Sequence, residues 1–369
     1  MTRLPSLLVV TGTRADFGLW LPVLHAARNA ALPVRLLVMA MHLEERFGRT
    51  VDEVERSGFE IAASVPCTAE GDSLADMSIS LGRALSGVTP AIRDEGPDYV
   101  LVLGDRGEQL AAALAALHLN VSVVHLHGGE RTRGAIDDVV RDLISRIATL
   151  HMVATSEAAE SLAEMGIARQ RIEVTGAPGL DAIATRDTRS DHAILSRYGV
   201  ARGPYLLLVH HPETSGRVTP ARDVAQSIAA IREVGMPAIA VLPNADAGGR
   251  AIASAINSDP AHFIGVYASI PHDDFLRLLA GAAALVGNSS SGIIEAPMLG
   301  VPAVNIGRRQ EGRTRGDNVI DVPADTAEVA AALHRVIDPT FRRALSGRSP
   351  YGDGKAAPRI IDRILREVG

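Results

Sequence analysis

Short apolar runs alternate with helix-length amphipathic stretches from one end of this 369-residue chain to the other. Such alternation is typical of a doubly wound α/β protein, in which helices cover both faces of a parallel sheet. The runs are nearly continuous in Val, Leu and Ile, as expected for strands buried on both faces. The predicted strands are Leu7–Thr11, Val34–Met39, Tyr99–Leu103, Val121–Leu126, Met152–Ala154 and Ile172–Val174 in the first half, and Tyr205–Val209, Ala238–Leu242, Phe263–Val266, Ala284–Val286 and Ala303–Ile306 in the second.

The chain is long enough for two domains of this kind. The segment from Gly176 to Gly203 has no strong strand and is rich in charge, so a linker is predicted near Gly179–Asp187. We therefore expect one Rossmann-like domain over residues 1–180 and a second over residues 181–355. Residues 356–369 carry apolar side chains at helical spacing and could pack back onto the first domain as a helix. Because ligands of doubly wound sheets bind at the carboxyl ends of the strands, we expect the two domains to face a cleft lined by strand-end loops.

Composition narrows the kind of partner. Aromatic residues make up 3% of the chain, which disfavours stacking of single-stranded nucleic acid, and the formal net charge of -6 disfavours a general polyanion binder. Cys67 is the only cysteine, so an intrachain disulfide and a cysteine zinc site are excluded, and a reducing, cytoplasmic setting fits. The apolar run near the N-terminus is too short for a signal peptide or a membrane span.

A triple-serine turn follows one of the predicted strands. The apolar run Ala282–Val286 ends in Gly-Asn-Ser-Ser-Ser-Gly, and a helix is predicted to begin at Ile293. Serines before a helix can cap its free N–H groups, and the same donors with the helix dipole form an anion site. Gly292 permits close approach of a ligand, and Glu295 could accept both hydroxyls of a ribose. This stretch predicts a seat for a nucleotide pyrophosphate, with an ordinary serine-capped turn as the alternative.

Two arginines follow the next strand. The run Val301–Ile306 is predicted to deliver Arg308 and Arg309 to its carboxyl end. That edge of a parallel sheet is where ligands bind, so these arginines are candidate phosphate-binding groups.

The loop after the first strand, Thr11 to Gly18, reads TGTRADFG. Gly12 permits a tight turn, and Arg14 could reach a phosphate. The loop has neither the three spaced glycines of a dinucleotide-binding turn nor the Gly-Lys-Ser/Thr of a Walker loop. A plain surface turn between strand and helix is the alternative.

A second loop, Leu103 to Glu108, also follows a strand. Asp105 comes after a glycine and can project into the expected cleft, where Arg106 would tune it as an acid or base. Capping of a helix that begins near Glu108 is the alternative.

The loop from His125 to Asp138 is the densest, with two histidines, three acids and two arginines. Strand alternation predicts that His125 and His127 point the same way. Asp137 falls with Asp138 at a helix start, where capping explains one of them but not Glu130. A metal site is disfavoured because no metal-binding spacing is present. The helix that follows carries an apolar stripe of Ile136, Val139, Val140, Leu143, Ile144, Ile147 and Leu150.

Two loops of the second half carry further candidates. His211 precedes Pro212, which holds it in an extended backbone, and it could donate to a phosphate or protonate a leaving group. Asn244 at a strand end could bind a base or a phosphate, although a turn explains the composition of its loop equally well.

Together these motifs resemble the hydrolysing UDP-N-acetylglucosamine 2-epimerases of sialic acid biosynthesis and their relatives in legionaminic acid synthesis. The resemblance runs in consistent order from Gly12 to Val322, and the combination is specific although each piece alone is not. It implies the two-domain fold called GT-B, in agreement with the alternating pattern. The motifs are GTRADFG, GDRGE, HGGE with IDD, HPET, NADAG, GNSSSGIIEAP and GRRQEGR.

The resemblance implies that UDP-GlcNAc and water give UDP and N-acetylmannosamine, by loss of UDP across sugar carbons 1 and 2 and addition of water to the resulting glycal. It implies no redox cofactor, no metal in the chemical step, and a homodimer or homotetramer. Asp105, Glu130 and Asp137 would move protons, and His211 would lie beside the diphosphate. Some relatives carry a glutamate at the position of His127, so this histidine is a further acid/base candidate. The implied nucleotide-binding residues are Arg14, Arg106, Asn244, Ser289, Ser290, Glu295 and Arg309.

The resemblance leaves the sugar open between GlcNAc and a 2,4-diacetamido-trideoxy sugar, and the nucleotide open between UDP and GDP. A non-hydrolysing 2-epimerase is one alternative. A glycosyltransferase of the same fold is another, although the sequence lacks the basic, apolar membrane patch that such enzymes frequently show. A binding module without turnover is a third, and the full set of acids at the strand ends disfavours it.

Overall fold

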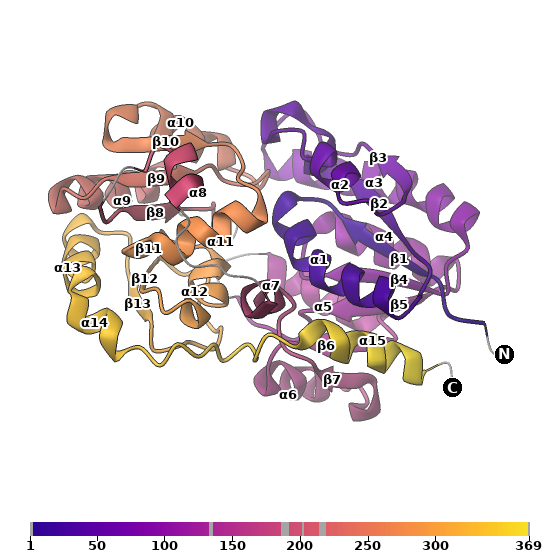
Figure 1. Cartoon of the computed structure of the whole chain (residues 1–369). Coiled ribbons are helices and arrows are strands. Elements are labelled where there is room, and N and C mark those ends of the chain that lie inside the picture. Colours follow the sequence, from indigo (N-terminus) through magenta and orange to yellow (C-terminus); the bar gives the residue numbers. More distant parts are fainter. Residues whose placement is uncertain (1–2, 133–135, 186–191, 201–202, 214–218, 368–369) are drawn as a thin grey trace. The chain divides into compact units, whose positions relative to one another are not determined.

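The computed structural model describes residues 3–132, 136–185, 192–200, 203–213 and 219–367 (Figure 1). The end of the predicted linker, residues 186–187, and parts of two predicted site loops, residues 133–135 and 214–215, lie outside this description. The chain divides into two compact units, each an α/β structure with one sheet. The first unit comprises Met1–Glu130, Ile136–Ala184 and Tyr351–Gly369, and the second comprises Arg131–Ala135 and Thr185–Pro350.

The first unit contains a seven-stranded sheet in the order β3-β2-β1-β4-β5-β6-β7, and every neighbouring pair is parallel. Helices α1, α2 and α15 bury their apolar side chains on one face, and α3, α4 and α5 on the other. The strands are β1 (Leu7–Thr11), β2 (Val34–Met39), β3 (Ile61–Val65), β4 (Tyr99–Leu103), β5 (Ser122–Leu126), β6 (Leu150–Val153) and β7 (Ile172–Val174); the α-helices are α1 (Arg14–Asn29), α2 (Val51–Arg56), α3 (Leu74–Glu95), α4 (Gly107–His118), α5 (Asp137–Ile147), α6 (Ser156–Glu164), α7 (Gly179–Thr185) and α15 (Ala356–Arg366).

The second unit contains a six-stranded parallel sheet in the order β10-β9-β8-β11-β12-β13. Helices α9, α10 and α13 pack on one face, and α11 and α12 on the other. The strands are β8 (Leu206–Val209), β9 (Ala238–Val241), β10 (Phe263–Tyr267), β11 (Ala284–Gly287), β12 (Ala303–Ile306) and β13 (Val319–Val322); the α-helices are α8 (His192–Arg197), α9 (Pro220–Val234), α10 (Gly249–Asn257), α11 (His272–Gly281), α12 (Glu295–Met298), α13 (Thr326–Ile337) and α14 (Pro339–Ala344).

Each sheet has one point where the strand order reverses. It lies between β1 and β4 in the first sheet and between β8 and β11 in the second. Ligands of doubly wound proteins bind outside the carboxyl ends of the strands at such a point. The loops after these four strands are four of the loops that the sequence selected.

The C-terminal helix α15 packs within the first unit, beside α1 (Figure 1). Ile360, Ile361 and Ile364 are buried in the same cluster as Trp20 of α1. Asp181 of α7 caps the helix, because its carboxylate oxygens accept from the main-chain N–H groups of Ala356 and Ala357 at 2.9 and 2.7 Å. No described helix is long and apolar enough to cross a membrane.

Candidate active site

The loop after β1 holds Arg14 in an ion pair. Its Nε lies 2.8 Å from Glu53 Oε2 of α2, so the guanidinium predicted to reach a phosphate already has an acidic partner in this structure. Thr13 and Asp16 form a capping box at the start of α1. The local sequence therefore fixes where α1 begins and where Arg14 leaves the backbone.

Asp16 also ends a buried chain of polar groups. The Thr11 hydroxyl donates to Asp16 and lies 2.9 Å from His42 Nε2, and His42 Nδ1 lies 2.7 Å from the Thr50 hydroxyl. Burial raises the pKa of Asp16 to about 7, and burial together with the charge of Arg14 lowers the pKa of His42 to about 4. This series of hydrogen bonds anchors the loop after β1 through side chains that were not predicted from the sequence.

Asp105, after β4, is paired with Arg141 of α5. Helix α4 begins at Gly107 and, in the described structure, has no side-chain cap, so the alternative that Asp105 caps it is not observed. Arg106 Nε donates to Glu108 Oε1 at 2.6 Å.

Arg141 is the centre of the acidic cluster. Its side chain is fully buried, and besides pairing with Asp105 it donates to Asp138 Oδ1 at 2.7 Å and to the main-chain oxygen of Glu130 at 2.8 Å. Burial alone would lower the pKa of Arg141, but the charges of the surrounding acids, Asp105 foremost, hold it above its usual value. A permanently charged guanidinium thus gathers acids from three separate stretches of chain.

The two histidines after β5 have different surroundings. His125 donates through Nε2 to the Gly104 carbonyl at 2.7 Å, and its Nδ1 accepts from the Ser145 hydroxyl at 3.1 Å. Burial lowers its pKa to about 3, so it is neutral. His127 lies beyond the end of β5 with a φ of 61°, and its Nδ1 contacts Glu130 Oε1 at 2.6 Å. Strand alternation therefore does not apply to His127, because its left-handed backbone ends the extended strand, although its N–H still donates to the Met152 carbonyl of β6 at 3.2 Å.

Helix α5 begins at Asp137, and only part of the predicted apolar stripe is buried: Ile144 lies in the core with Val140 and Ile147 packed beside it. Val139 and Leu143 are 64% and 46% exposed, whereas Arg141 and Ser145 are fully buried. The polar side chains turn inward because Arg141 reaches Asp105 and Ser145 reaches His125. The buried face of α5 is therefore shared between apolar residues of the stripe and two polar residues that the stripe does not predict.

In the second unit, Asn288 joins the ends of two strands. Its Oδ1 accepts from the His211 main-chain N–H at 2.7 Å, and its Nδ2 donates to the His211 carbonyl at 2.9 Å. The Asn244 main-chain N–H donates to His211 Nδ1 at 3.4 Å, which places the proton of the neutral ring on Nε2. Gly287 must be glycine here, because its φ is 124° and a Cβ would lie 2.1 Å from the Val209 carbonyl.

The triple-serine turn differs from the prediction. Ser289 caps a short 3₁₀ turn, Ser290–Gly292, by accepting from the Ser291 N–H, and α12 begins only at Glu295. The helix predicted to begin at Ile293 is thus two residues later and four residues long, too short to supply a strong dipole. Donors for an anion must come from serine hydroxyls and turn N–H groups.

Arg309 meets the same asparagine. Arg309 Nη1 and Gln310 Nε2 donate to the Asn288 carbonyl at 3.2 and 2.9 Å. Glu213 Oε1 accepts from the main-chain N–H groups of Arg308 and Arg309 at 2.6 and 3.1 Å. Arg308 itself is exposed. The loops after β8, β11 and β12 are therefore tied together by neutral amides and one carboxylate.

The structure gathers the predicted residues into two sets. Asp105, Glu130, Asp137 and His127 lie around or beside Arg141 in the first unit, and the loops of His211, Ser289 and Arg309 meet at Asn288 in the second. Sequence reasoning missed Arg141, Asn288 and Glu213. Arg141 could have been noticed as an arginine inside an apolar stripe. Asn288 and Glu213 could have been noticed as polar residues within motifs whose other residues were predicted to bind substrate.

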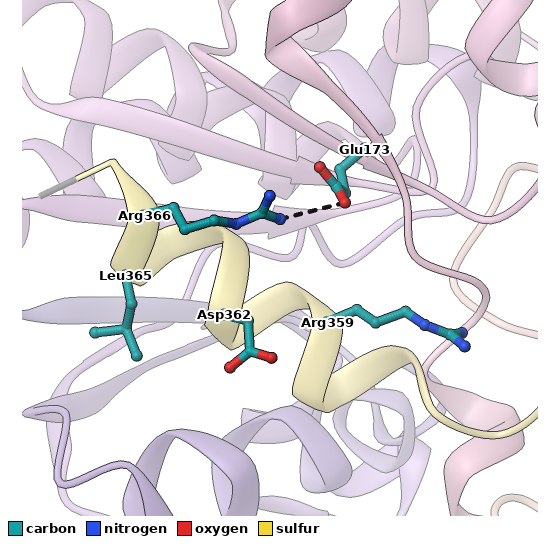
Figure 2. Close-up of a pocket in the computed structure, with 5 residues that line it drawn as sticks. All are labelled: Glu173, Arg359, Asp362, Leu365 and Arg366. Carbon is teal, nitrogen blue, oxygen red and sulfur yellow. Dashed lines mark ion pairs between the residues drawn. The ribbon is translucent and has the colours of Figure 1, made fainter. Parts of the chain in front are cut away.

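No group of three or more His, Cys, Asp or Glu in the described ranges could hold a metal ion. An open pocket of about 450 Å³ lies beside α15, lined by Glu173, Arg359, Asp362, Leu365 and Arg366 (Figure 2). Arg366 Nη2 is 3.3 Å from Glu173 Oε1, so this lining is partly ion-paired. It contains none of the predicted site residues.

Two parallel-sheet units with polar loops at their switch points define a protein of the GT-B-like class. A solved structure of UDP-GlcNAc 2-epimerase from Neisseria meningitidis, bound to UDP-GlcNAc, has a TM-score of 0.81 at 18% identity over 98% of this chain and 100% of its own. A family model described as UDP-N-acetylglucosamine 2-epimerase matches residues 25–365. The chain belongs to this family.

Two curated relatives are hydrolysing enzymes. The UDP-N,N'-diacetylbacillosamine 2-epimerase (hydrolyzing) of Legionella pneumophila is 36% identical over 98% of this chain and 96% of its own. The GDP/UDP-N,N'-diacetylbacillosamine 2-epimerase (hydrolyzing) of Campylobacter jejuni is 29% identical over 98% and 95%. The family expected from the motifs is thereby confirmed.

Proposed function

We propose that this protein is a hydrolysing 2-epimerase. It would convert a UDP- or GDP-linked acetamido sugar and water to the free 2-epimeric sugar and the nucleoside diphosphate. The observation that carries the proposal is the buried Arg141, which pairs with Asp105 and Asp138 and holds the main chain of Glu130 beside His127. Proton removal and return at one carbon needs several titratable groups in fixed positions.

The first unit would supply the proton-moving groups Asp105, Glu130, Asp137 and His127, with Arg14 and Arg106 binding substrate. The second unit would hold the nucleotide. His211 with its proton on Nε2, Ser289, Ser290 and Arg309 are donors suited to a diphosphate, and Asn244 and Glu295 would contact the nucleoside.

The chemistry begins with loss of the proton on sugar carbon 2. The released electron pair forms the bond between carbons 1 and 2, and the nucleoside diphosphate leaves carbon 1 with its bonding pair. Water then adds its hydroxyl to carbon 1 and a proton returns to the opposite face of carbon 2. Fixed donors at the diphosphate lower the barrier because negative charge grows there as the bond breaks.

Similarity to two diacetylbacillosamine enzymes supports a 2,4-diacetamido-trideoxy sugar as the first substrate to test. Purified protein should be incubated with UDP-N,N'-diacetylbacillosamine and, in parallel, with UDP-GlcNAc and the GDP-linked sugar. We expect free nucleoside diphosphate and free 2-epimer from at least one of them. A product that keeps its nucleotide would identify a non-hydrolysing epimerase, and nucleotide binding without any product would identify a binding module.

The family resemblance also supports a cytoplasmic homodimer or homotetramer that acts in sialic or legionaminic acid biosynthesis. Light scattering on the purified protein tests the assembly, and a monomer at micromolar concentration would contradict it.

A further inference from the structure

The loop between β5 and α5 holds a histidine–carboxylate pair. His127 and Glu130 are both buried, and Nδ1 of the ring lies 2.6 Å from Oε1 of the carboxylate. We propose that His127 is the base that removes the proton from sugar carbon 2 through Nε2, and that Glu130 is a positioning residue that orients the ring. This inference rests on the proposed function, because it divides the work among residues of that site.

The backbone is built to bring these two side chains together. His127 has a φ of 61°, a left-handed conformation that is strained for a non-glycine residue. Gly129 has a φ of 77°, and a Cβ there would lie 2.2 Å from the Ala158 carbonyl. The chain therefore makes a tight reversal over two glycines, which brings the Glu130 side chain back to the ring of His127. Backbone strain held in this way is frequent at functional sites.

Glu130 is anchored independently of the histidine. Arg141 Nη1 donates to its main-chain oxygen at 2.8 Å, and Arg141 is held in turn by Asp105 and Asp138. The carboxylate therefore approaches His127 from a fixed backbone, which is what an orienting group requires.

The contact decides which ring nitrogen is available. A carboxylate accepts, so the proton of the neutral ring lies on Nδ1 and the lone pair on Nε2. Nε2 is buried and has no hydrogen-bond partner within the described residues. His125 provides the contrast, because both of its nitrogens are engaged. One histidine is a structural group, and the other keeps a buried nitrogen for a ligand.

The assignment suits the chemistry. Nε2 would take the proton, the carbon 2 electron pair would form the double bond to carbon 1, and the diphosphate would leave with its bonding pair. Nε2, unpartnered among the described residues, offers a nitrogen lone pair to the C–H, while the carboxylate of Glu130 is already engaged with Nδ1. Inversion at carbon 2 needs a different group to return the proton, and Asp105 and Asp137 remain for that step.

The test uses the full-length protein with the sugar nucleotide that the wild type hydrolyses. H127A should lose about 100- to 10,000-fold in kcat, bind UDP within about threefold of wild type, and regain part of its rate with added imidazole. E130Q should lose about 10- to 100-fold in kcat with little change in KM. The double variant should be no slower than H127A, because Glu130 acts through the ring.

H151L is the matched control. His151 is a fully buried histidine on the neighbouring strand β6, so replacing it tests burial without touching the pair. It should keep its turnover. If H127A does not fold, H127Q replaces it. An H127 variant that binds UDP and keeps a rate within about tenfold of wild type would overturn the proposal, as would a double variant whose loss is the product of the two single losses. A wild type without turnover would instead overturn the proposed function.

Discussion

The switch points of the two sheets carry opposite kinds of polar structure. At the first, a buried guanidinium is surrounded by acids: Arg141 pairs with Asp105 and Asp138. At the second, the strand ends are joined mainly by neutral amides. The Asn288 side chain hydrogen-bonds the main-chain N–H and carbonyl of His211, and the Asn288 carbonyl accepts from the Gln310 side chain. Under the proposed function, the ionic site moves protons and the amide site presents fixed donors to a diphosphate. The same position in the same kind of fold can thus serve either task, depending on whether its buried groups titrate.

The two sites also differ in what a substitution leaves behind. Removing one member of a buried ion cluster leaves uncompensated charge, which costs about 3–5 kcal/mol. Removing a neutral amide leaves an unsatisfied hydrogen bond, which costs about 1–3 kcal/mol. This difference sets the order of the expected effects.

Arg141→Met should give the largest effect. The substitution leaves Asp105 and Asp138 without their buried cation, so the free energy of unfolding should fall by about 3–5 kcal/mol. Urea unfolding measures the change, and nucleotide release should fall by at least about 100-fold. Arg141→Lys keeps the positive charge but lacks the several N–H donors of the guanidinium. It should therefore restore more of the stability than of the rate of nucleotide release. An Arg141→Met protein as stable as wild type would show that the buried ion pairs of the first unit do not differ in energetic weight from the amide hydrogen bonds of the second.

Acid should weaken the first unit more than the second. Burial lowers the pKa of His42, His125 and His151 in the first unit to about 4, 3 and 4, and that of His210 in the second to about 4. Folded pKa values below the ordinary 6.5 mean that these histidines bind more protons in the unfolded chain, so the stability that they contribute is full above about pH 6.5 and falls as pH falls towards 4. Asp16, whose pKa is raised to about 7, acts in the opposite direction and offsets part of this loss. H151L should flatten this loss by up to about 3 kcal/mol in urea unfolding between pH 7 and 4. An unchanged slope would show that His151 is not held neutral by burial.

Asn288→Ala should act on binding. Stability should fall by about 1–3 kcal/mol, and UDP affinity should fall about tenfold, because His211 and Arg309 lose their shared anchor. Asn305→Ala is the matched control: Asn305 is also buried, and its Nδ2 donates to Asp321 Oδ1 at 2.6 Å. It should lose stability but keep UDP affinity by calorimetry. Equal affinity losses in the two variants would mean that Asn288 has no special place in the amide site.

Asp181→Ala should have the smallest effect. Asp181 belongs neither to the ionic site around Arg141 nor to the amide site around Asn288. The substitution removes the cap of α15, which should cost about 0.5–2 kcal/mol without changing the rate per folded molecule. A loss of turnover at full folding would show that the first unit transmits changes from α15 to its site.

Much of the fold could be predicted because central parallel strands are continuous apolar runs. The two strands that were missed, β3 and β13, lie at sheet edges, where Ile61–Val65 and Val319–Val322 are only partly buried and include polar residues. Edge strands need apolar residues on fewer positions, so their pattern is weaker. The loops that carry the candidate site were found because each follows a recognisable strand.

The organising residues of the site were harder to predict. Arg141 looks like an interruption of an apolar stripe, and only the fold shows that Asp105, from 36 positions away, meets it. The helix start at Ile293 was wrong because Ser290–Gly292, capped by Ser289, form a 3₁₀ turn before α12. Contacts between distant segments are absent from local periodicity.

The most direct test follows the reaction by proton NMR in D₂O, with UDP-N,N'-diacetylbacillosamine and UDP-GlcNAc as substrates. The account predicts free UDP and a free 2-epimeric sugar that carries deuterium at carbon 2, because the proton is removed by the protein and replaced from solvent. A sugar that keeps its original proton at carbon 2, or one that stays joined to its nucleotide, would contradict it.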